Sequence, residues 1–442
     1  MKTAGIIAEY NPFHNGHQFH IEETRRRTGA DYVIVVMSGD FVQCGAPAIL
    51  NKYDRADMAL RHGADLVVEL PVTAALSSAE GFAMGSISLL DRLGVVDVVS
   101  CGCENADADS ARFGKIVSLL ADEPEGYRHL LASYIREGFT FPKAREMAAE
   151  QYLRNEIGDA GTKSASSVRQ LLSEPNNILA LEYAKAIHKR NSSLTLCMIP
   201  RQGSAYHDAD LSGKYCSATA IRNYLLSDSS HNPTSHSHKS FAPPQTHAAA
   251  ANDPFANCVP TGIADALQYA AANHRCLCEN DFSDLLFYAL TEKKEWLSCF
   301  GPDSSGLAFR TENLLENFES WTSFAALLKT KNQTYTAISR YLAQVLLDIT
   351  KEDLQLSASC SHAPFARVLG FRRDAAPLLK AMQSQADIPI LTQLAKNGEK
   401  LNAGQNRLLD LTLRSSEIYK RILFTCSGSR LKSEYRQPML VY

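Results

Sequence analysis

The chain of 442 residues contains no apolar run as long as the roughly 18 residues that a transmembrane helix needs. Near the N-terminus, a weak charged region at Lys2 and an apolar stretch that ends at Glu9 do not match a secretory signal. The 11 cysteines are an odd number without framework spacing, which fits a reducing compartment better than secretion. These absences exclude membrane proteins and disulfide scaffolds, and we expect a cytoplasmic protein with no membrane partner.

Strong charge of either sign is also absent, because the formal net charge is −3. This value excludes a protein that wraps a polyanion over its whole surface, although it permits a local basic patch. Two C-x-C pairs, Cys101/Cys103 and Cys276/Cys278, lack the C-x-x-C spacing that zinc prefers and have no partner pair. We therefore expect no metal site at the cysteines.

The first half of the chain alternates short apolar runs with helical patterns. The runs are β-branched and almost continuously apolar, as parallel strands buried on both faces are. They lie at residues 4–10, 32–37, 65–70, 95–102 and 194–200. Helical patterns between them, such as 18–29 and 51–64, end near a glycine. This order predicts an α/β fold with a Rossmann-like, doubly wound parallel sheet, which binds ligands beyond the carboxyl ends of its strands.

The length of the chain exceeds one compact core, so we expect two domains. Residues 1–226 form the predicted α/β domain. Residues 227–253 are rich in Ser, His, Pro and Ala without periodicity, and we expect a poorly ordered linker there. From 254 to 442 the pattern is helical, which predicts an all-helical second domain.

The segment NPFHNGHQFH, residues 11–20, follows the first predicted strand. A helix that begins there offers unpaired backbone N–H groups to an anion. His14 and His17 lie three residues apart on one helical face, and Gly16 permits close approach of a ligand. Imidazoles in this place can donate hydrogen bonds to a phosphate undergoing transfer. The pattern predicts catalytic His14 and His17, whereas His20 is expected to pack; the alternative is a simple capping turn.

This HNGH segment resembles the H-x-G-H signature of the nucleotidyltransferase superfamily related to class I aminoacyl-tRNA synthetases. A second segment, SATAIR at 217–222, resembles the S-x-T-x-I-R phosphate-binding motif of the same enzymes. Ser217 and Thr219 suit the N-terminus of a helix, and Arg222 suits pyrophosphate.

The resemblance narrows over longer stretches: GIIAEYNPFHNGH, MSGDFVQCGAPAILNKYDRADMAL and GADLVVELP are similar to the tRNA(Met) cytidine acetate ligase family. It implies an enzyme that activates acetate with ATP, with Mg²⁺ expected, forms acetyladenylate and releases pyrophosphate. The acetyl group then goes to N4 of the wobble cytidine of elongator tRNA(Met). No covalent enzyme intermediate is needed, which fits the absence of a convincing nucleophile.

The resemblance also implies the site residues. The implied ATP-binding residues are Gly5, Ile6, Ile7, Ala8, Glu9, Tyr10, Asn11, Pro12, Phe13, His14, Asn15, Gly16, His17, Gly102, Asn177, Arg201, Ser217, Thr219 and Arg222. For Asn177 the alternative is helix capping after Pro175. Asp40 follows the second predicted strand and is expected as a catalytic residue that orients Mg²⁺ or the cytidine amine, with a turn aspartate as the alternative.

The implied tRNA-binding residues lie in the second half of the chain. They are Lys329, Lys331, Arg340, Arg372 and Arg373, and Arg367 belongs to the same basic segment. The sequence departs from the family at Cys44, Asn332 and Ala337, where basic residues are usual. Each lost phosphate contact weakens RNA binding.

Two other functions stay open at the level of the sequence. The changed basic positions favour a nucleotide- or RNA-binding protein that has lost ligation. A small-molecule adenylyltransferase is the second alternative, although its substrate would not need so long a helical extension.

Overall fold

The computed structural model describes residues 1–104, 110–157, 171–172, 174–202, 211, 213–228, 254–301, 306–331, 333–397 and 400–442. The predicted linker at 227–253 lies outside the described residues from position 229 onward. Within the described ranges, no helix is both long enough and apolar enough to cross a membrane.

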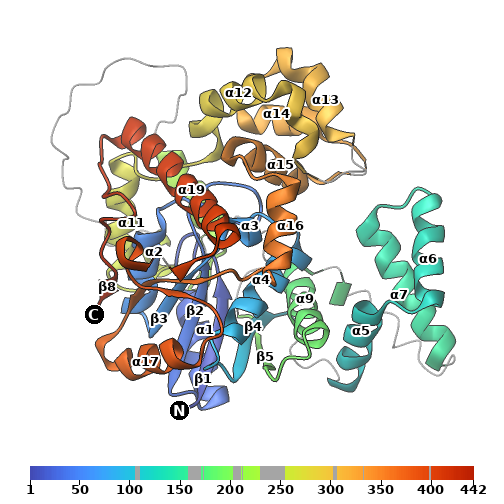
Figure 1. The fold of residues 1–442 in the computed structure, drawn as a ribbon, viewed down its shortest axis with the longest axis horizontal. Coiled ribbons are helices and arrows are strands. Elements are labelled where there is room, and N and C mark those ends of the chain that lie inside the picture. Colours follow the sequence, from blue (N-terminus) through green and yellow to red (C-terminus); the bar gives the residue numbers. More distant parts are fainter. Residues whose placement is uncertain are drawn as a thin grey trace.

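An eight-stranded sheet forms the centre of the molecule, in the order β5-β4-β1-β2-β3-β6-β7, with β8 paired to β6 (Figure 1). Five strands run parallel: β1 Thr3–Ala8, β2 Tyr32–Ser38, β3 Leu66–Leu70, β4 Val98–Cys103 and β5 Thr195–Pro200. Each coincides with one of the five apolar runs. The predicted Rossmann-like parallel sheet is therefore confirmed.

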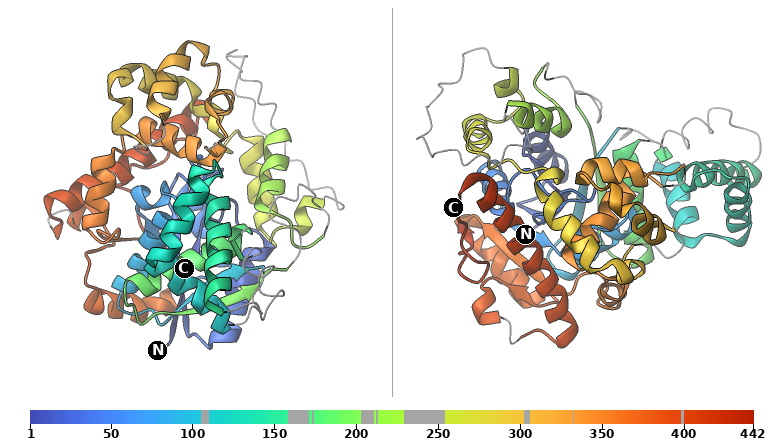
Figure 2. Two further views of the ribbon diagram at one scale, coloured as in Figure 1. Left: turned by 90° about the vertical axis from the view of Figure 1, so that its right-hand side faces the viewer. Right: turned by 90° about the horizontal axis from the view of Figure 1, so that it is seen from above.

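Helices of the first half cross over between these strands or extend from them. They are α1 Asn15–Thr28, α2 Lys52–Arg61, α3 Val72–Ala75, α4 Ala79–Arg92, α5 Ser110–Asp122, α6 Glu125–Arg136, α7 Phe141–Ile157, α9 Pro175–Lys189 and α10 Ala218–Asp228. Figure 2 shows α5, α6 and α7 as a group that projects to one side of the sheet.

The region from 254 onward is mainly helical. Its longer helices are α11 Ile263–Ala272, α12 Ser283–Glu292, α13 Leu307–Leu314, α14 Trp321–Leu328, α15 Tyr335–Leu347, α16 Lys351–Ser359, α17 Ala376–Gln385, α18 Leu394–Asn397 and α19 Ala403–Ser427. Short 3₁₀ segments are η1 Pro254–Asn257, η2 Glu279–Phe282, η3 Lys294–Cys299, η4 Leu315–Asn317 and η5 Arg373–Ala375.

Helices cover the two faces of the sheet, which explains why the strands are apolar throughout. Val33 and Val35 of β2 pack toward α1, α2, α10 and α11. Their neighbours Ile34 and Val36 pack on the other face, toward α4, α9 and α17. Because successive side chains of a strand point to opposite faces, both sets must be apolar.

The second half is not all-helical, and this part of the prediction is wrong. It contains β6 Ala366–Phe371, β7 Ile390–Leu391 and β8 Leu440–Val441. β6 pairs antiparallel with β3 and so extends the sheet of the first half. Its charged residue Arg367 made this segment look like a basic surface, yet Arg367 is buried. The division into domains at 226 and 254 stays a prediction, and the pairing ties the two halves together.

A buried charged cluster explains how Arg367 is accommodated. Its Nη1 lies 2.9 Å from Glu69 Oε2, and its Nη2 donates to Glu434. The fully buried Lys52 Nζ lies 2.8 Å from Glu69 Oε1 and 3.0 Å from Glu434 Oε2. Burial alone would raise the pKa of Glu434, but the cations of Lys52, Arg367 and Lys420 hold it well below its usual range. The cluster therefore joins α2, β3, β6 and the C-terminal segment.

Candidate active site

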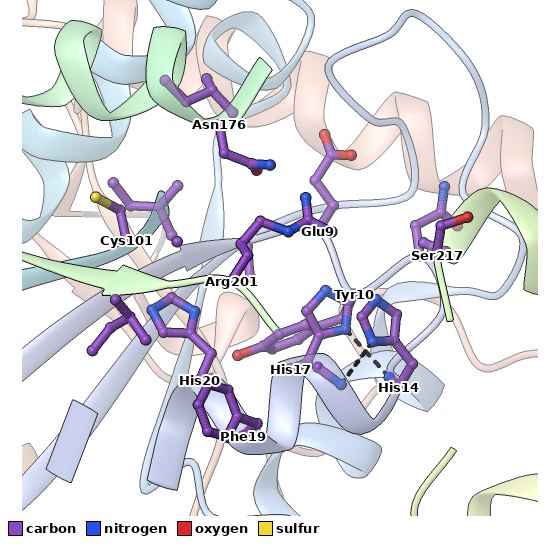
Figure 3. Close-up of a pocket in the computed structure, with 18 of the residues that line it drawn as sticks. Glu9, Tyr10, His14, His17, Phe19, His20, Cys101, Asn176, Arg201 and Ser217 are labelled. Atoms are coloured by element: carbon purple, nitrogen blue, oxygen red, sulfur yellow. Dashed lines mark hydrogen bonds between the residues drawn. The ribbon is translucent and has the colours of Figure 1, made fainter. Parts of the chain in front are cut away.

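A cavity of about 280 Å³ opens beyond the carboxyl ends of β1, β4 and β5 (Figure 3). The first residues of α1 and α10 complete its wall. This is the place where doubly wound sheets bind ligands. The HNGH segment from β1 and the SATAIR segment from α10, about 200 residues apart in the chain, both line it.

Hydrogen bonds to the backbone fix the tautomers of His14 and His17. His14 caps α1, and its Nδ1 accepts from Gly16 N at 3.0 Å. Nδ1 of His17 accepts from His14 N at 3.3 Å. An imidazole nitrogen that accepts carries no proton, so each neutral ring holds its proton on Nε2. The rings stack with centroids 3.7 Å apart, and the pair presents two Nε2–H donors to one place.

The positive charge of the cavity resides on arginines. Burial, and then the charges of Arg201 and Arg222, lowers the pKa of His14 to about 3. Burial, followed by His14, His20 and Arg201, lowers the pKa of His17 well below its usual value. Both rings are therefore neutral donors at pH 7, while Arg201 and Arg222 supply charge for an anion.

The SATAIR segment joins the HNGH segment through Arg222. Its Nη1 donates to Asn11 O at 2.7 Å and its Nη2 to Thr219 Oγ1 at 3.0 Å. Ser217 Oγ accepts from Ala220 N at 3.0 Å, as expected of a residue that caps a helix. Two helix N-termini consequently converge on the cavity, and both favour negative charge there.

A disulfide supports this wall of the cavity. Cys216, directly before the SATAIR segment, is bonded to Cys258, and their Cα atoms are 5.4 Å apart. Cys258 O accepts from Asn15 N at 3.1 Å, and Asn15 Nδ2 donates to Asn257 O and Lys214 O. The pair was not foreseen, because a spacing of 42 residues carries no signal in the sequence.

The structure brings most of the predicted ATP-binding residues together. Those lining the cavity are Ile7, Ala8, Glu9, Tyr10, Asn11, His14, Gly16, His17, Gly102, Arg201, Ser217, Thr219 and Arg222. Those outside its lining are Gly5, Ile6, Pro12, Phe13, Asn15 and Asn177.

The residues outside the lining have packing or positioning roles. At Gly5 a Cβ would meet Leu90 Cδ2 at 2.6 Å, so glycine lets α4 pack closely on β1. Asn177 is fully buried, and its Oδ1 accepts from Glu104 N at 3.0 Å and from Cys103 Sγ. Its neighbour Asn176 faces the cavity instead. The predicted asparagine thus positions the end of β4.

Asp40 does not face the cavity. Its Oδ1 accepts from Lys52 N at 2.8 Å, and Oδ2 lies 3.8 Å from Lys52 Nζ, so it belongs to the buried charged cluster. No group of three or more His, Cys, Asp or Glu side chains among the described residues has a metal-binding arrangement. Asp40 does not fit a Mg²⁺ ligand at this cavity, and we derive no step through the metal.

Several lining residues were not predicted, among them His20, Gln43 and Tyr183. His20 continues the three-residue spacing of His14 and His17, which was the available signal. Its Nε2 lies 3.0 Å from Ser100 Oγ on β4. Gln43 and Tyr183 come from a loop and from α9, and nothing in the sequence marks them.

The predicted RNA-binding residues fall into two separate groups. Lys329 and Lys331 are exposed before α15, and Arg340 of α15 donates to Gln43 O at 3.2 Å, beside the cavity. Arg372 N instead donates to Asp65 O, at the amino end of β3.

The second group, Arg372 and Arg373, therefore lies at the opposite end of the sheet from the first. A strand of six or seven residues spans roughly 20 Å, which separates the groups by at least that distance. Arg372 is 39% exposed on its side chain and pairs with Asp374.

The fold and the paired histidines define a class of enzyme. The family model described as HIGH Nucleotidyl Transferase matches residues 1–434. The tRNA(Met) cytidine acetate ligase of Acetivibrio thermocellus is 31% identical over 443 residues, with 100% of both chains covered. That of Clostridium acetobutylicum is 34% identical over 444 residues, again with 100% of both covered.

Solved structures show the same likeness. Apo Thermotoga maritima TmcAL superposes with a TM-score of 0.87 and 27% identity, covering 100% of this chain and 99% of that one. TmcAL of the same organism bound with alpha-thio ATP gives a TM-score of 0.85 at 27% identity, with 100% of both chains covered. The chain belongs to the HIGH nucleotidyl transferases and, among them, to the tRNA(Met) cytidine acetate ligase family.

Proposed function

We propose that this protein is an ATP-dependent acetate ligase that acetylates N4 of the wobble cytidine of elongator tRNA(Met) in the cytoplasm. The observation that carries the proposal is the pair of neutral Nε2–H donors, His14 and His17, beside Arg201 and Arg222 in one cavity. Membership of the ligase family supplies the substrates, and the ATP-analogue complex of a family member supports ATP in this cavity. The disulfide is not required, since both cysteines are thiols in a reducing compartment.

The first half-reaction forms acetyladenylate. An acetate oxygen attacks the α-phosphorus of ATP while the bond to the pyrophosphate oxygen breaks. Negative charge grows on the leaving pyrophosphate, where His17 Nε2–H, Arg222 and the N-terminus of α10 can stabilise it. Neutral histidines suit this task because they donate hydrogen bonds without first losing a proton to the phosphate.

The second half-reaction transfers the acetyl group to the RNA. N4 of the cytidine attacks the acetyl carbonyl carbon, and AMP leaves with the electron pair of the broken C–O bond. Lys329, Lys331 and Arg340 lie on the side of the cavity and are proposed to hold phosphates of the tRNA near it. Arg372 and Arg373 would serve only a part of the RNA that reaches the far end of the sheet.

Isotope exchange between pyrophosphate and ATP tests the proposal. Exchange should require acetate, and labelled acetate should then appear in elongator tRNA(Met) with formation of AMP. Exchange without acetate would indicate a small-molecule adenylyltransferase. ATP binding without any exchange would indicate a binding protein that has lost ligation.

A further inference from the structure

Glu9 is the one carboxylate that lines the cavity in the described part of the chain. It directly follows β1 and lies beside the residues that bind phosphate. Figure 3 shows its carboxylate on the side away from His14 and His17 and near Asn176. An acid is unexpected in a cavity that takes up acetate and triphosphate, because like charges repel.

The protein holds Glu9 firmly from two sides. Its Oε1 accepts from Gln43 N at 2.7 Å. Its main-chain oxygen accepts from Nη1 of the fully buried Arg55 at 2.5 Å, and the same guanidinium holds Ser38 O at 3.1 Å. Oε2 has no hydrogen-bond partner among the residues that the structure describes. One oxygen is therefore fixed and the other is left for a ligand.

Acetyl transfer needs a group that accepts a proton. When N4 attacks the carbonyl carbon, the C–N bond forms, the C–O bond to AMP breaks, and one N4 proton must leave. His14 and His17 do not suit this role, because Nδ1 of each already accepts a backbone N–H and Nε2 carries a proton. Tyr10 and Tyr183 are phenols whose pKa is raised by burial, so both stay protonated.

We propose that Glu9 is the general base that removes the N4 proton during acetyl transfer. The inference rests on the proposed function and adds a catalytic residue to its second step. Glu9 Oε2 takes the proton from N4 and returns it to solvent after AMP leaves.

The charges around Glu9 suit a base of this kind. Burial raises the pKa of Glu9, whereas the hydrogen bond from Gln43 N and the positive charges of Arg222 and Arg55 lower it. Tyr183 and Cys44 also face it, and both are neutral because burial raises their pKa. A carboxylate with a raised pKa accepts a proton more readily near neutral pH than an ordinary one.

The test separates the two half-reactions in the full-length enzyme. Glu9→Gln keeps an oxygen that can accept from Gln43 N but removes the base. We expect acetate-dependent pyrophosphate exchange within about threefold of wild type, because general-base work is absent from that step. Single-turnover transfer from preformed acetyladenylate to elongator tRNA(Met) should slow by about 10²-fold or more. Glu9→Asp, which keeps a carboxylate, should recover part of the transfer rate.

The pH profile supplies a readout that a structural role would not move. In the wild type, transfer should fall at acidic pH as Glu9 is protonated, and Glu9→Gln should lack this limb. Wild-type transfer by Glu9→Gln would overturn the proposal, as would equal loss of exchange and transfer. A wild-type enzyme that exchanges pyrophosphate but acetylates no tRNA would overturn the proposed function itself, and the role of Glu9 with it.

Discussion

Replacing His17 tests whether the histidine pair works by donating a hydrogen bond in the transition state. Its Nδ1 accepts from His14 N, which caps α1, while Nε2–H faces the cavity. His17→Asn keeps an acceptor near the Nδ1 position but removes the donor at Nε2. His17→Gln keeps an amide N–H that reaches as far as Nε2, and glutamine also suits this helix position in a capping box.

The expected magnitude follows from the number of contacts removed. Loss of one preorganised donor to a developing oxyanion costs about 10²- to 10³-fold in turnover, or roughly 2.7–4 kcal/mol. Loss of a helix cap costs about 0.5–2 kcal/mol of stability and leaves chemistry largely alone. His17→Asn should therefore lose about 10²-fold or more in exchange turnover with little change in KM for ATP, and His17→Gln should lose clearly less.

Acetate-dependent pyrophosphate exchange, measured over a range of ATP concentrations, gives both constants, and thermal unfolding checks that each variant is folded. An interaction made only in the transition state lowers turnover without weakening substrate binding. Turnover of His17→Asn within threefold of wild type would refute the donor role. Equal losses in turnover and ATP affinity would mean that His17 only binds the nucleotide.

Three further predictions concern RNA, the charged cluster and pH. Lys329→Ala/Lys331→Ala should weaken tRNA binding and flatten its dependence on log salt by about one unit per contact, while Arg372→Ala/Arg373→Ala should change filter binding less; the opposite ranking would place the RNA at the far end of the sheet. Glu434→Gln strips buried cations of their partner and should cost about 3–5 kcal/mol in urea unfolding, and a loss under 1 kcal/mol would contradict this. Because burial lowers the pKa of the pocket histidines, the unfolded chain binds protons that the fold does not, so stability should fall as pH drops below about 6.5, by up to about 1.4 kcal/mol per histidine and pH unit; an unchanged urea midpoint at pH 5 would argue against it.

The α/β half of the fold was predictable because its signals are local. Each parallel strand is an unbroken apolar run, and the HNGH segment directly follows the first of them. A helix start after a strand supplies the same anion site wherever it occurs, so the pairing of His14 and His17 could be predicted from spacing alone.

The parts that escaped prediction depend on partners distant in the chain. Arg367 was expected on the surface because its burial requires Glu69 and Glu434, which lie far from it in sequence. Asn176 and Asn177 are adjacent, and only the packing of α9 on β4 decides which of them faces the cavity. A sequence indicates which side chains are capable of chemistry more readily than which way they turn.

The pairing of β3 with β6 imposes an order on how the chain folds. Val68 is paired with Val368, so the edge of β3 stays open during synthesis until some 300 further residues have emerged. Glu69 and Lys52 are then also without Arg367 and Glu434. An open strand edge beside unmatched charges is a site for wrong pairing with another chain. A fragment ending near residue 226 should therefore aggregate when expressed alone, and the nascent protein should depend on chaperones until its last quarter is made.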